Sequence, residues 1–231
     1  MNGILVAADI TVEWMLPWWW EHYRKHNSSP VAFIDLGMSL EQKKWCKKRG
    51  HLIPLRIVDF AAEESKVDPA ISKQWKDDSG GKHFWESRNA WFKKPFACLQ
   101  SPFERTVWID LDCEVRGSLY SLFNYSFALA KDEFQPMLNY PMFNSGVIAF
   151  HRNYPLLKDW ADYCNRFHHN FRGDQEVLSY LIAERKADIT TLPPNFNWSR
   201  CKEESPEIII LHWHGSIGKS VIKFQTTSNN W

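Results

Sequence analysis

The amino-acid sequence predicts an α/β fold in which helices flank a mainly parallel central sheet. Two observations carry this prediction. Short, continuously apolar segments, typical of strands buried on both faces of a sheet, alternate with amphipathic segments of helical period. Polar clusters stand at the ends of several of these strands, where open α/β sheets bind their ligands. Because the sequence has no internal repeat or linker, we expect a single domain.

The first half of the chain predicts regular alternation of strands and helices. One helix has clear end signals, with Ser39 as N-cap, Gln42 three residues later and Gly50 as its stop. Pro54 indicates an edge position or a bulge in its strand, because proline cannot donate to the sheet ladder. The other expected elements are strands over 3–9, 31–35 and 51–58, and helices over 12–26 and about 84–99.

Residues 61–81 form a long polar connection with little periodicity. Long loops in compact domains are often functional lids, and a mobile surface loop is the other interpretation.

The second half continues with strands and two amphipathic helices. Strands are expected over 127–132 and 142–151. The apolar stripe from Leu156 to Phe167 predicts one helix, and a second begins near Asp174. The last strand is expected over 206–215, followed by a C-terminal tail at about 216–231.

Composition excludes several classes of protein. With 231 residues, 44% hydrophobic and 24% charged, the chain is globular, and its net charge of +1 does not predict nucleic-acid binding. The first ten residues lack the basic start and the long apolar stretch typical of a signal peptide, and no apolar run is long enough for a transmembrane helix, although peripheral membrane contact stays open. The scattered cysteines lack CxxC spacing, which favours a reducing, cytoplasmic compartment over disulfides or a structural zinc site: Cys46, Cys98, Cys113, Cys164 and Cys201.

Three consecutive tryptophans, Trp18 to Trp20, lie in the first expected helix. On a helix they spread over about 200°, so they cannot share one narrow buried stripe. Wide packing between helix and sheet is the favoured interpretation, and an acceptor or partner surface is the alternative.

Asp110 and Asp112 interrupt the apolar segment 106–115. In a strand, residues two apart point to the same face, so both carboxylates are expected to project together. Two adjacent carboxylates repel each other, and a divalent cation such as Mg²⁺ or Mn²⁺ would offset that repulsion. A solvated strand end is the alternative interpretation.

A second group of candidate ligands follows the last expected strand. His212 and His214 would share a face by the same two-residue rule, and either imidazole could complete a mixed nitrogen and oxygen site. Glycines and Lys219 lie close by in the sequence.

Taken together, these motifs resemble the nucleotide-diphospho-sugar transferases of GT-A fold, particularly glycosyltransferase family 8 and its glycogenin-like members. The shared features are, in order, AAD at the end of the first strand, a basic residue, DxD, FNSGV, a DQ pair and an HxxGxxK-like segment. They span almost the whole chain. The resemblance implies one GT-A (Rossmann-like) domain, with a nucleotide-binding part at about 1–115 and a sugar and acceptor part at about 116–215.

The resemblance also implies a metal site. Asp110, Asp112 and His212 would hold Mn²⁺ or Mg²⁺, and His212 is favoured over His214 because it stands three residues before Gly215. The metal would bridge the two phosphates of a nucleotide-sugar. Lys219, one residue later than the usual spacing, would contact the pyrophosphate.

Further donor contacts follow from the same resemblance. Lys94, or less favourably Arg88, matches the basic residue that contacts the donor. Ala8 and Asp9 would face the base, although Ile10 and Thr11 depart from the usual pattern after AAD.

FNSGV and the DQ pair would lie beside the sugar. Asn144 and Ser145 would be its neighbours, unless this motif is a turn before a strand. Asp174 and Gln175 would lie near the transferred sugar, and the same segment is also a good helix start.

The implied function is a metal-dependent glycosyltransferase, with hexosyl transfer from a UDP-sugar to a glycan, lipid or protein acceptor and with retention of configuration. A nucleotide-sugar-binding module without turnover is one alternative. A haloacid-dehalogenase-type phosphatase is another, but its DxD lies in the first strand, and Glu114 stands where Thr or Val is normal.

Overall fold

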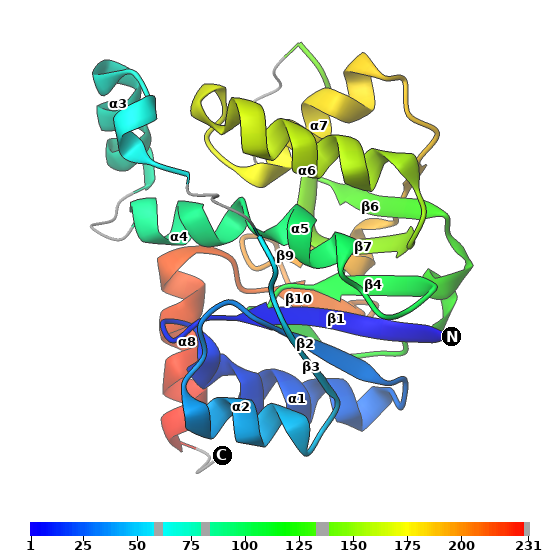
Figure 1. The fold of residues 1–231 in the computed structure, drawn as a ribbon. Helices are drawn as coiled ribbons and strands as arrows, with labels where there is room; N and C mark the ends of the chain where they lie inside the picture. The colour runs from blue at the N-terminus through cyan, green and yellow to red at the C-terminus, as the bar shows by residue number, and fades with distance from the viewer. Residues whose placement is uncertain (58–61, 80–83, 133–138, 229–231) are drawn as a thin grey trace.

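The computed structural model describes residues 1–57, 62–79, 84–132 and 139–228, and its centre is a seven-stranded sheet with helices on both faces (Figure 1). Strands β3, β2, β1 and β4 run parallel to one another. β7 lies antiparallel between β4 and β6, and β8 is parallel to β6. The predicted fold class is therefore confirmed. In spatial order the strands are β3 (His51–Pro54), β2 (Val31–Asp35), β1 (Asn2–Ala8), β4 (Arg105–Ile109), β7 (Phe143–His151), β6 (Phe127–Lys131) and β8 (Thr190–Thr191).

A second, three-stranded sheet joins segments that are distant in the sequence. Its strands are β5 (Cys113–Val115), β10 (Ile210–His212) and β9 (Trp198–Ser199), with β10 in the middle. β5 directly follows the acidic turn after β4, and it pairs antiparallel with β10. The small sheet therefore places the start of β5 beside the end of the last strand.

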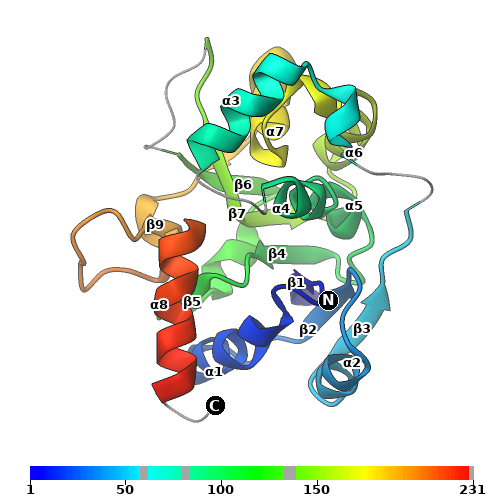
Figure 2. The same cartoon turned by 90° about the vertical axis from the view of Figure 1, so that its left-hand side faces the viewer.

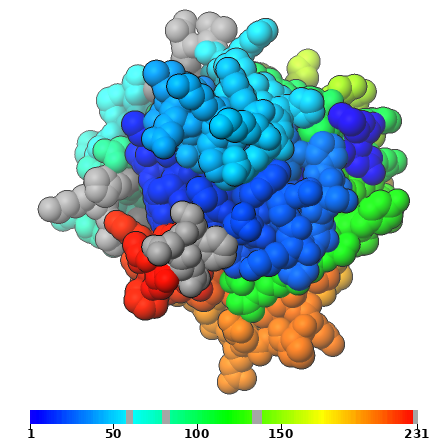
Figure 3. Space-filling model, turned by 90° about the horizontal axis from the view of Figure 1, so that it is seen from below, coloured from blue at the N-terminus to red at the C-terminus, as the bar shows by residue number. Residues whose placement is uncertain are grey.

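Helices cover the two faces of the main sheet and enclose two apolar cores (Figure 2). One face carries α1 (Leu16–His26), α2 (Leu40–Lys47) and α8 (Gly215–Ser228), and Figure 3 looks onto this side of the molecule. The other face carries α4 (Phe84–Trp91), α5 (Lys94–Leu99), α6 (Pro155–Phe167) and α7 (Asp174–Glu184), with α3 (Pro69–Ser79) farther out. The short 3-10 helices are η1 (Glu13–Met15), η2 (Glu64–Lys66), η3 (Tyr120–Asn124), η4 (His168–Asn170) and η5 (Pro194–Phe196).

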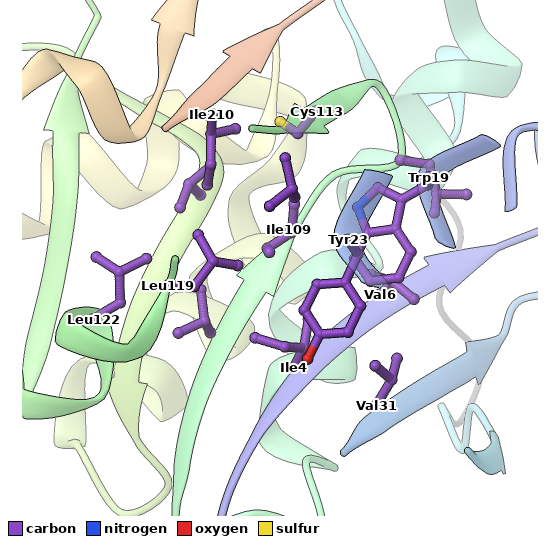
Figure 4. Close-up of a cluster of buried hydrophobic side chains, with 14 of the residues drawn as sticks. Ile4, Val6, Trp19, Tyr23, Val31, Ile109, Cys113, Leu119, Leu122 and Ile210 are labelled. Carbon is purple, nitrogen blue, oxygen red and sulfur yellow. The ribbon is translucent and has the colours of Figure 1, made fainter. Parts of the chain in front are cut away.

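The tryptophans of α1 pack between helix and sheet. Trp18 and Trp19 are fully buried, and Trp19 stacks on Tyr23 with ring centroids 5.1 Å apart. Trp20 is half-buried and lies against Phe33 of β2. Figure 4 shows Trp19 and Tyr23 in this core. The packing interpretation is confirmed.

Several end signals act as predicted. The Ser39 hydroxyl accepts a hydrogen bond from the Gln42 backbone N–H at 3.2 Å, which caps α2. Pro54 lies in β3, the edge strand of the main sheet, although this strand ends four residues earlier than expected. The expected end at residue 58 lies outside the described residues.

The connection expected over residues 61–81 was wrong in its described part, because it contains η2 and α3. The Asp68 carboxylate accepts from the backbone N–H groups of Ala70 and Ile71, at 2.9 and 3.3 Å. This cap, followed by Pro69 in the first turn, starts a helix that a purely periodic search misses. Residues 61, 80 and 81 lie outside the described part of the chain.

The C-terminal segment is a helix rather than an irregular tail. β10 is shorter than the strand expected over 206–215, and α8 begins at Gly215. A side chain at Gly218 would come within 1.7 Å of the Trp213 carbonyl oxygen, so only glycine permits this close approach. Trp18 Nε1 donates to Gln225 Oε1 at 2.9 Å and ties α8 to α1. Residues 229–231 lie outside the description.

Candidate functional site

The two aspartates lie in a turn between the two sheets. β4 ends at Ile109, and the Cys113 backbone N–H donates to the Asp110 carbonyl at 3.0 Å. The expectation that Asp110 and Asp112 lie within one strand was therefore wrong. The chain leaves the main sheet at Ile109 because the next residues pair with β10 in the small sheet.

Both aspartates nevertheless line one open cleft. This strand-end cleft lies where the parallel strands β1 and β4 end, and Asp9, Lys94 and Lys219 also line it. The turn thus brings the two carboxylates to the same hollow by a different route from the one predicted.

Asp110 belongs to a closed group that we call the Lys94 cluster: Trp108, Lys94, Asp110, Ser145 and Asp174. Lys94 Nζ lies 3.0 Å from Asp110 Oδ1 and 3.7 Å from Asp174 Oδ2, and it donates to Ser145 Oγ at 3.0 Å. The Ser145 hydroxyl donates to Asp174 Oδ2 at 2.8 Å, and Trp108 Nε1 donates to Asp110 Oδ1 at 2.7 Å. One ammonium group therefore holds two carboxylates together.

Within this cluster, Lys94 and Asp174 stabilise each other's charged forms. Burial lowers the pKa of Lys94, but Asp110 and Asp174 beside it raise that pKa above its ordinary value. Burial raises the pKa of Asp174 above its ordinary value, and Lys94 acts against that effect. The Lys94 side chain is only 7% exposed, so its positive charge serves the cluster rather than the solvent.

Asp112 has different surroundings, in a group that we call the His212 cluster: Asp112, Cys113 and His212. Asp112 Oδ1 lies 3.3 Å from His212 Nε2. Burial raises the pKa of Asp112, but His212, Lys219 and Lys94 together outweigh burial and hold the pKa well below the usual range. Asp112 is therefore ionised at neutral pH.

A chain of hydrogen bonds shows that Nδ1 of His212 carries a proton. A carboxylate only accepts hydrogen bonds, so the Asn144 amide donates to Asp132 Oδ2 at 3.3 Å. Asn144 Oδ1 then accepts from the Asn197 amide at 3.0 Å, and Asn197 Oδ1 faces His212 Nδ1 at 2.9 Å. The His212 Nδ1–H thus donates to Asn197, and Nε2 faces the Asp112 carboxylate, to which it donates when it carries a proton.

Cys113 is a member of the site that sequence reasoning missed. It lies opposite His212 in the ladder between β5 and β10. One donor atom each of Asp112, Cys113 and His212 lie within 4.8 Å of one another. Burial raises the pKa of the Cys113 thiol well above its ordinary value. The scattered spacing of the cysteines concealed it, and its position directly after Asp112 was the signal available.

Gly146 makes room for the histidine. A side chain at this position would come within 2.4 Å of His212 Cε1. The glycine of FNSGV therefore allows the imidazole to lie directly against β7.

The donor set fits a divalent cation. Neighbouring ligands at right angles, with bonds of about 2.1 Å, lie roughly 3 Å apart. The 3.3 Å between Asp112 Oδ1 and His212 Nε2 matches that separation. Asp110 lies in the same cleft, but both of its carboxylate oxygens already accept from Lys94 or Trp108.

Lys219 lies in the first turns of α8 and lines the strand-end cleft. Gly215, at the start of this helix, has φ of +79°, a conformation that favours glycine. A cation near a helix N-terminus suits a phosphate ligand, because the helix dipole and the ammonium act in the same direction.

Of the two residues expected near the base, Asp9 lines the cleft and Ala8 does not. Asp9 lines the cleft, and its carboxylate accepts from the Thr11 backbone N–H and hydroxyl at 2.8 and 2.6 Å. The Ala8 side chain is buried in the core, and Ala7 lines the cleft in its place. The alternation of a strand accounts for this exchange.

Arg88 is held away from the cleft. Its guanidinium donates to the backbone carbonyls of Ala62, His168, Phe171 and Arg172, and the residue is completely buried. The less favoured basic candidate was therefore wrong as a donor contact. It joins the described start of the 62–79 segment to the connection before α7.

The FNSGV and DQ motifs meet in the structure. Asn144 and Ser145 lie within β7, so the interpretation as a turn before a strand was wrong. Ser145 contacts Asp174, and Gln175 Nε2 donates to Asp132 Oδ2 at 3.1 Å. Asp174 is also the first residue of α7, as the helix-start interpretation expected.

His214 faces another way. Its Nε2 lies 2.7 Å from Ser199 Oγ, and burial, with His212 nearby, lowers the pKa of His214 to about 4. His212 is thus the histidine beside Asp112.

Comparison with known proteins rests on structure, since no family model and no curated protein matches the sequence. The galactosyltransferase LgtC, in complex with donor and acceptor sugar analogues, is 15% identical, with 99% of this chain and 96% of that chain covered and a TM-score of 0.63. The glycosyltransferase GlyE of Streptococcus pneumoniae TIGR4 is 16% identical, with 100% and 65% covered and a TM-score of 0.61. The chain has the GT-A fold.

A third GT-A structure extends the likeness. The apo form of mouse xyloside xylosyltransferase 1 is 14% identical, with 92% of this chain and 97% of that chain covered and a TM-score of 0.55.

Within the described residues, no helix is long and apolar enough to cross a membrane.

Proposed function

We propose that this GT-A protein is a metal-dependent glycosyltransferase that moves a hexose from a UDP-sugar to a glycan, lipid or protein acceptor. One observation carries the proposal: Asp112, which lines the same cleft as Lys219, lies 3.3 Å from His212 Nε2, so that a carboxylate and an imidazole could share one cation there. The GT-A fold supports it, because the structures that share this fold are glycosyltransferases.

In this proposal, Asp112 and His212 hold Mn²⁺ or Mg²⁺. Asp110 joins them through the remaining lone pairs of its carboxylate, while Lys94 and Trp108 keep that carboxylate in place. When bound, the metal acts as a Lewis acid that offsets the negative charge developing on the nucleoside diphosphate.

The chain's own residues bind and orient the donor. Lys219, with the start of α8 beside it, would bind the pyrophosphate. The Lys94 cluster would form one wall of the sugar pocket, because Ser145 and Asp174 contact Lys94, which lines the cleft. Asp9 would approach the base.

The state of Asp174 bears on stereochemistry. Its side chain is only 6% exposed, and its carboxylate is bound by Lys94 and Ser145. A carboxylate held in this way is a poor nucleophile, which favours retention by front-face attack over a covalent sugar intermediate on Asp174. Gln175, which is hydrogen-bonded to Asp132, would stabilise the cationic sugar from the same side.

The compartment is part of the same proposal. All five cysteines are free, which accords with a reducing environment, and we place the enzyme in the cytoplasm.

Thermal-shift measurements with a panel of nucleotide-sugars test the proposal. We expect one donor to raise the melting temperature in the presence of Mn²⁺ and to have little effect without it. Asp112→Asn should abolish metal-dependent transfer, whereas Asp162→Asn, an exposed position on α6, should retain it. Full activity of Asp112→Asn would reject the proposal, and tight donor binding without transfer would favour a binding module.

A further inference from the structure

The His212 cluster contains a sulfur donor that a site for Mg²⁺ or Mn²⁺ does not need. Cys113 and His212 are cross-strand partners in the ladder between β5 and β10, and such partners point to the same face. Asp112 precedes Cys113, and one donor atom of each residue lies within 4.8 Å of the other two. Figure 4 shows the Cys113 sulfur at the upper end of the drawn side chains.

Three protein donors at this separation suit one tetrahedral ion. Ligands of a tetrahedral zinc ion, with bonds of about 2.0–2.3 Å, lie roughly 3.3–3.8 Å apart. The 4.8 Å limit therefore leaves about 1 Å to close, within reach of small side-chain rotations. His212 is already oriented, since Asn197 accepts its Nδ1–H and leaves Nε2 for the ion.

The chemical types of the donor atoms determine which metal ion the site prefers. Oxygen ligands suit Mg²⁺ and Mn²⁺, whereas thiolate and imidazole suit Zn²⁺, which also ranks above Mn²⁺ in general affinity for such sites. We propose that Asp112, Cys113 and His212 form a three-ligand site for Zn²⁺ and similar soft cations, beside the strand-end cleft that Asp112 lines. The thiol passes its proton to solvent as the sulfur–metal bond forms.

Such a site would make Zn²⁺ an inhibitor of the proposed enzyme. Zn²⁺ would draw Asp112 and His212 toward the fully buried sulfur, away from the cleft that Lys219 lines. Mn²⁺ needs the same two residues, so the ions would compete. This consequence rests on the proposed function, whereas the zinc site itself does not.

Cobalt spectroscopy on the full chain tests the site directly. Co²⁺ replaces Zn²⁺ in such sites and gives a near-ultraviolet charge-transfer band when it binds a thiolate. We expect this band in the wild-type protein and its loss in Cys113→Ser. Cys46→Ser is the matched control, because Cys46 is also buried and free but lies on α2. Zn²⁺ should also inhibit Mn²⁺-dependent transfer on the order of tenfold more weakly in Cys113→Ser.

The wild-type spectrum decides the matter even if Cys113→Ser fails to fold. Bound Co²⁺ without the band, absence of Co²⁺ binding, or an unchanged band in a folded Cys113→Ser protein would overturn the inference. Mn²⁺-dependent transfer without the band would leave the proposed function standing. If the charge-transfer band appears but the protein transfers sugar to no acceptor, the zinc site would be upheld and the proposed function would be contradicted.

Discussion

The Lys94 cluster and the His212 cluster hold the two aspartates of one turn in opposite ways. Asp110 is bound by a buried lysine and an indole, groups that serve structure and never ligate a metal. Asp112 is bound by His212, whose imidazole belongs to a side-chain type that can ligate a metal, and Cys113 lies beside it. Two residues of one motif can therefore differ in role: Asp110 is anchored in the cleft wall by Lys94 and Trp108, whereas Asp112 is, in the proposed function, the aspartate that contributes most to binding the ion.

The largest effect expected from this difference is the loss of the buried lysine. Lys94→Met leaves Asp110 and the buried Asp174 without their shared partner, and should lower the free energy of unfolding by about 3–5 kcal/mol. Urea denaturation measures this change. Unchanged stability would show that the Lys94 cluster does not stabilise the fold.

Lys219→Met is the complementary change. Lys219 is half-buried at the cleft and, among the described residues, acts on the buried Asp112 only through its charge, without a hydrogen bond or an ion pair at contact distance, so unfolding should shift by less than about 0.5 kcal/mol. Loss of one charge-assisted contact, about 1.5–3 kcal/mol, should weaken UDP binding roughly ten- to a hundredfold. Calorimetry at constant Mn²⁺ measures the affinity. Equal UDP affinity in both proteins would remove Lys219 from the diphosphate site.

The smallest effect concerns the residue behind His212. Asn197→Leu removes the acceptor of the Nδ1–H, and we expect Mn²⁺ affinity to fall by about tenfold, the lower end of the range for supporting residues. Asn197→Asp keeps an acceptor oxygen and should recover part of the loss. Nitrogen NMR of the His212 ring gives a second readout, because the proton should leave Nδ1 only in Asn197→Leu. An unchanged ring tautomer would contradict this role.

The sequence predicted well those features whose interactions lie close together along the chain, and poorly those that depend on distant segments. β1 and β2 were predictable because continuous apolar runs require burial on both faces, and α2 because its cap lies within four residues. The turn at Asp110 was not, since β4 ends where β5 begins to pair with a strand about a hundred residues later. Cys113 joined the site through that same long-range pairing.

The candidate site shows the same limit. Lys94, Asp112 and His212 were named from motif order; in the structure Lys94 and Asp112 line one cleft, and His212 contacts Asp112. Arg88 and Ala8 fit the same motifs, but burial directs their side chains elsewhere. Asn197 and Asp132 lie outside any motif and matter only because their side chains meet Asn144 in space.

Manganese binding, followed by electron paramagnetic resonance, tests the central claim most directly. Free Mn²⁺ gives a strong six-line signal in solution, which weakens as the ion binds. We predict that the wild-type protein binds one Mn²⁺ and that Asp112→Asn loses this binding, with a smaller loss in Asp110→Asn. Equal Mn²⁺ binding by wild type and Asp112→Asn would contradict the account.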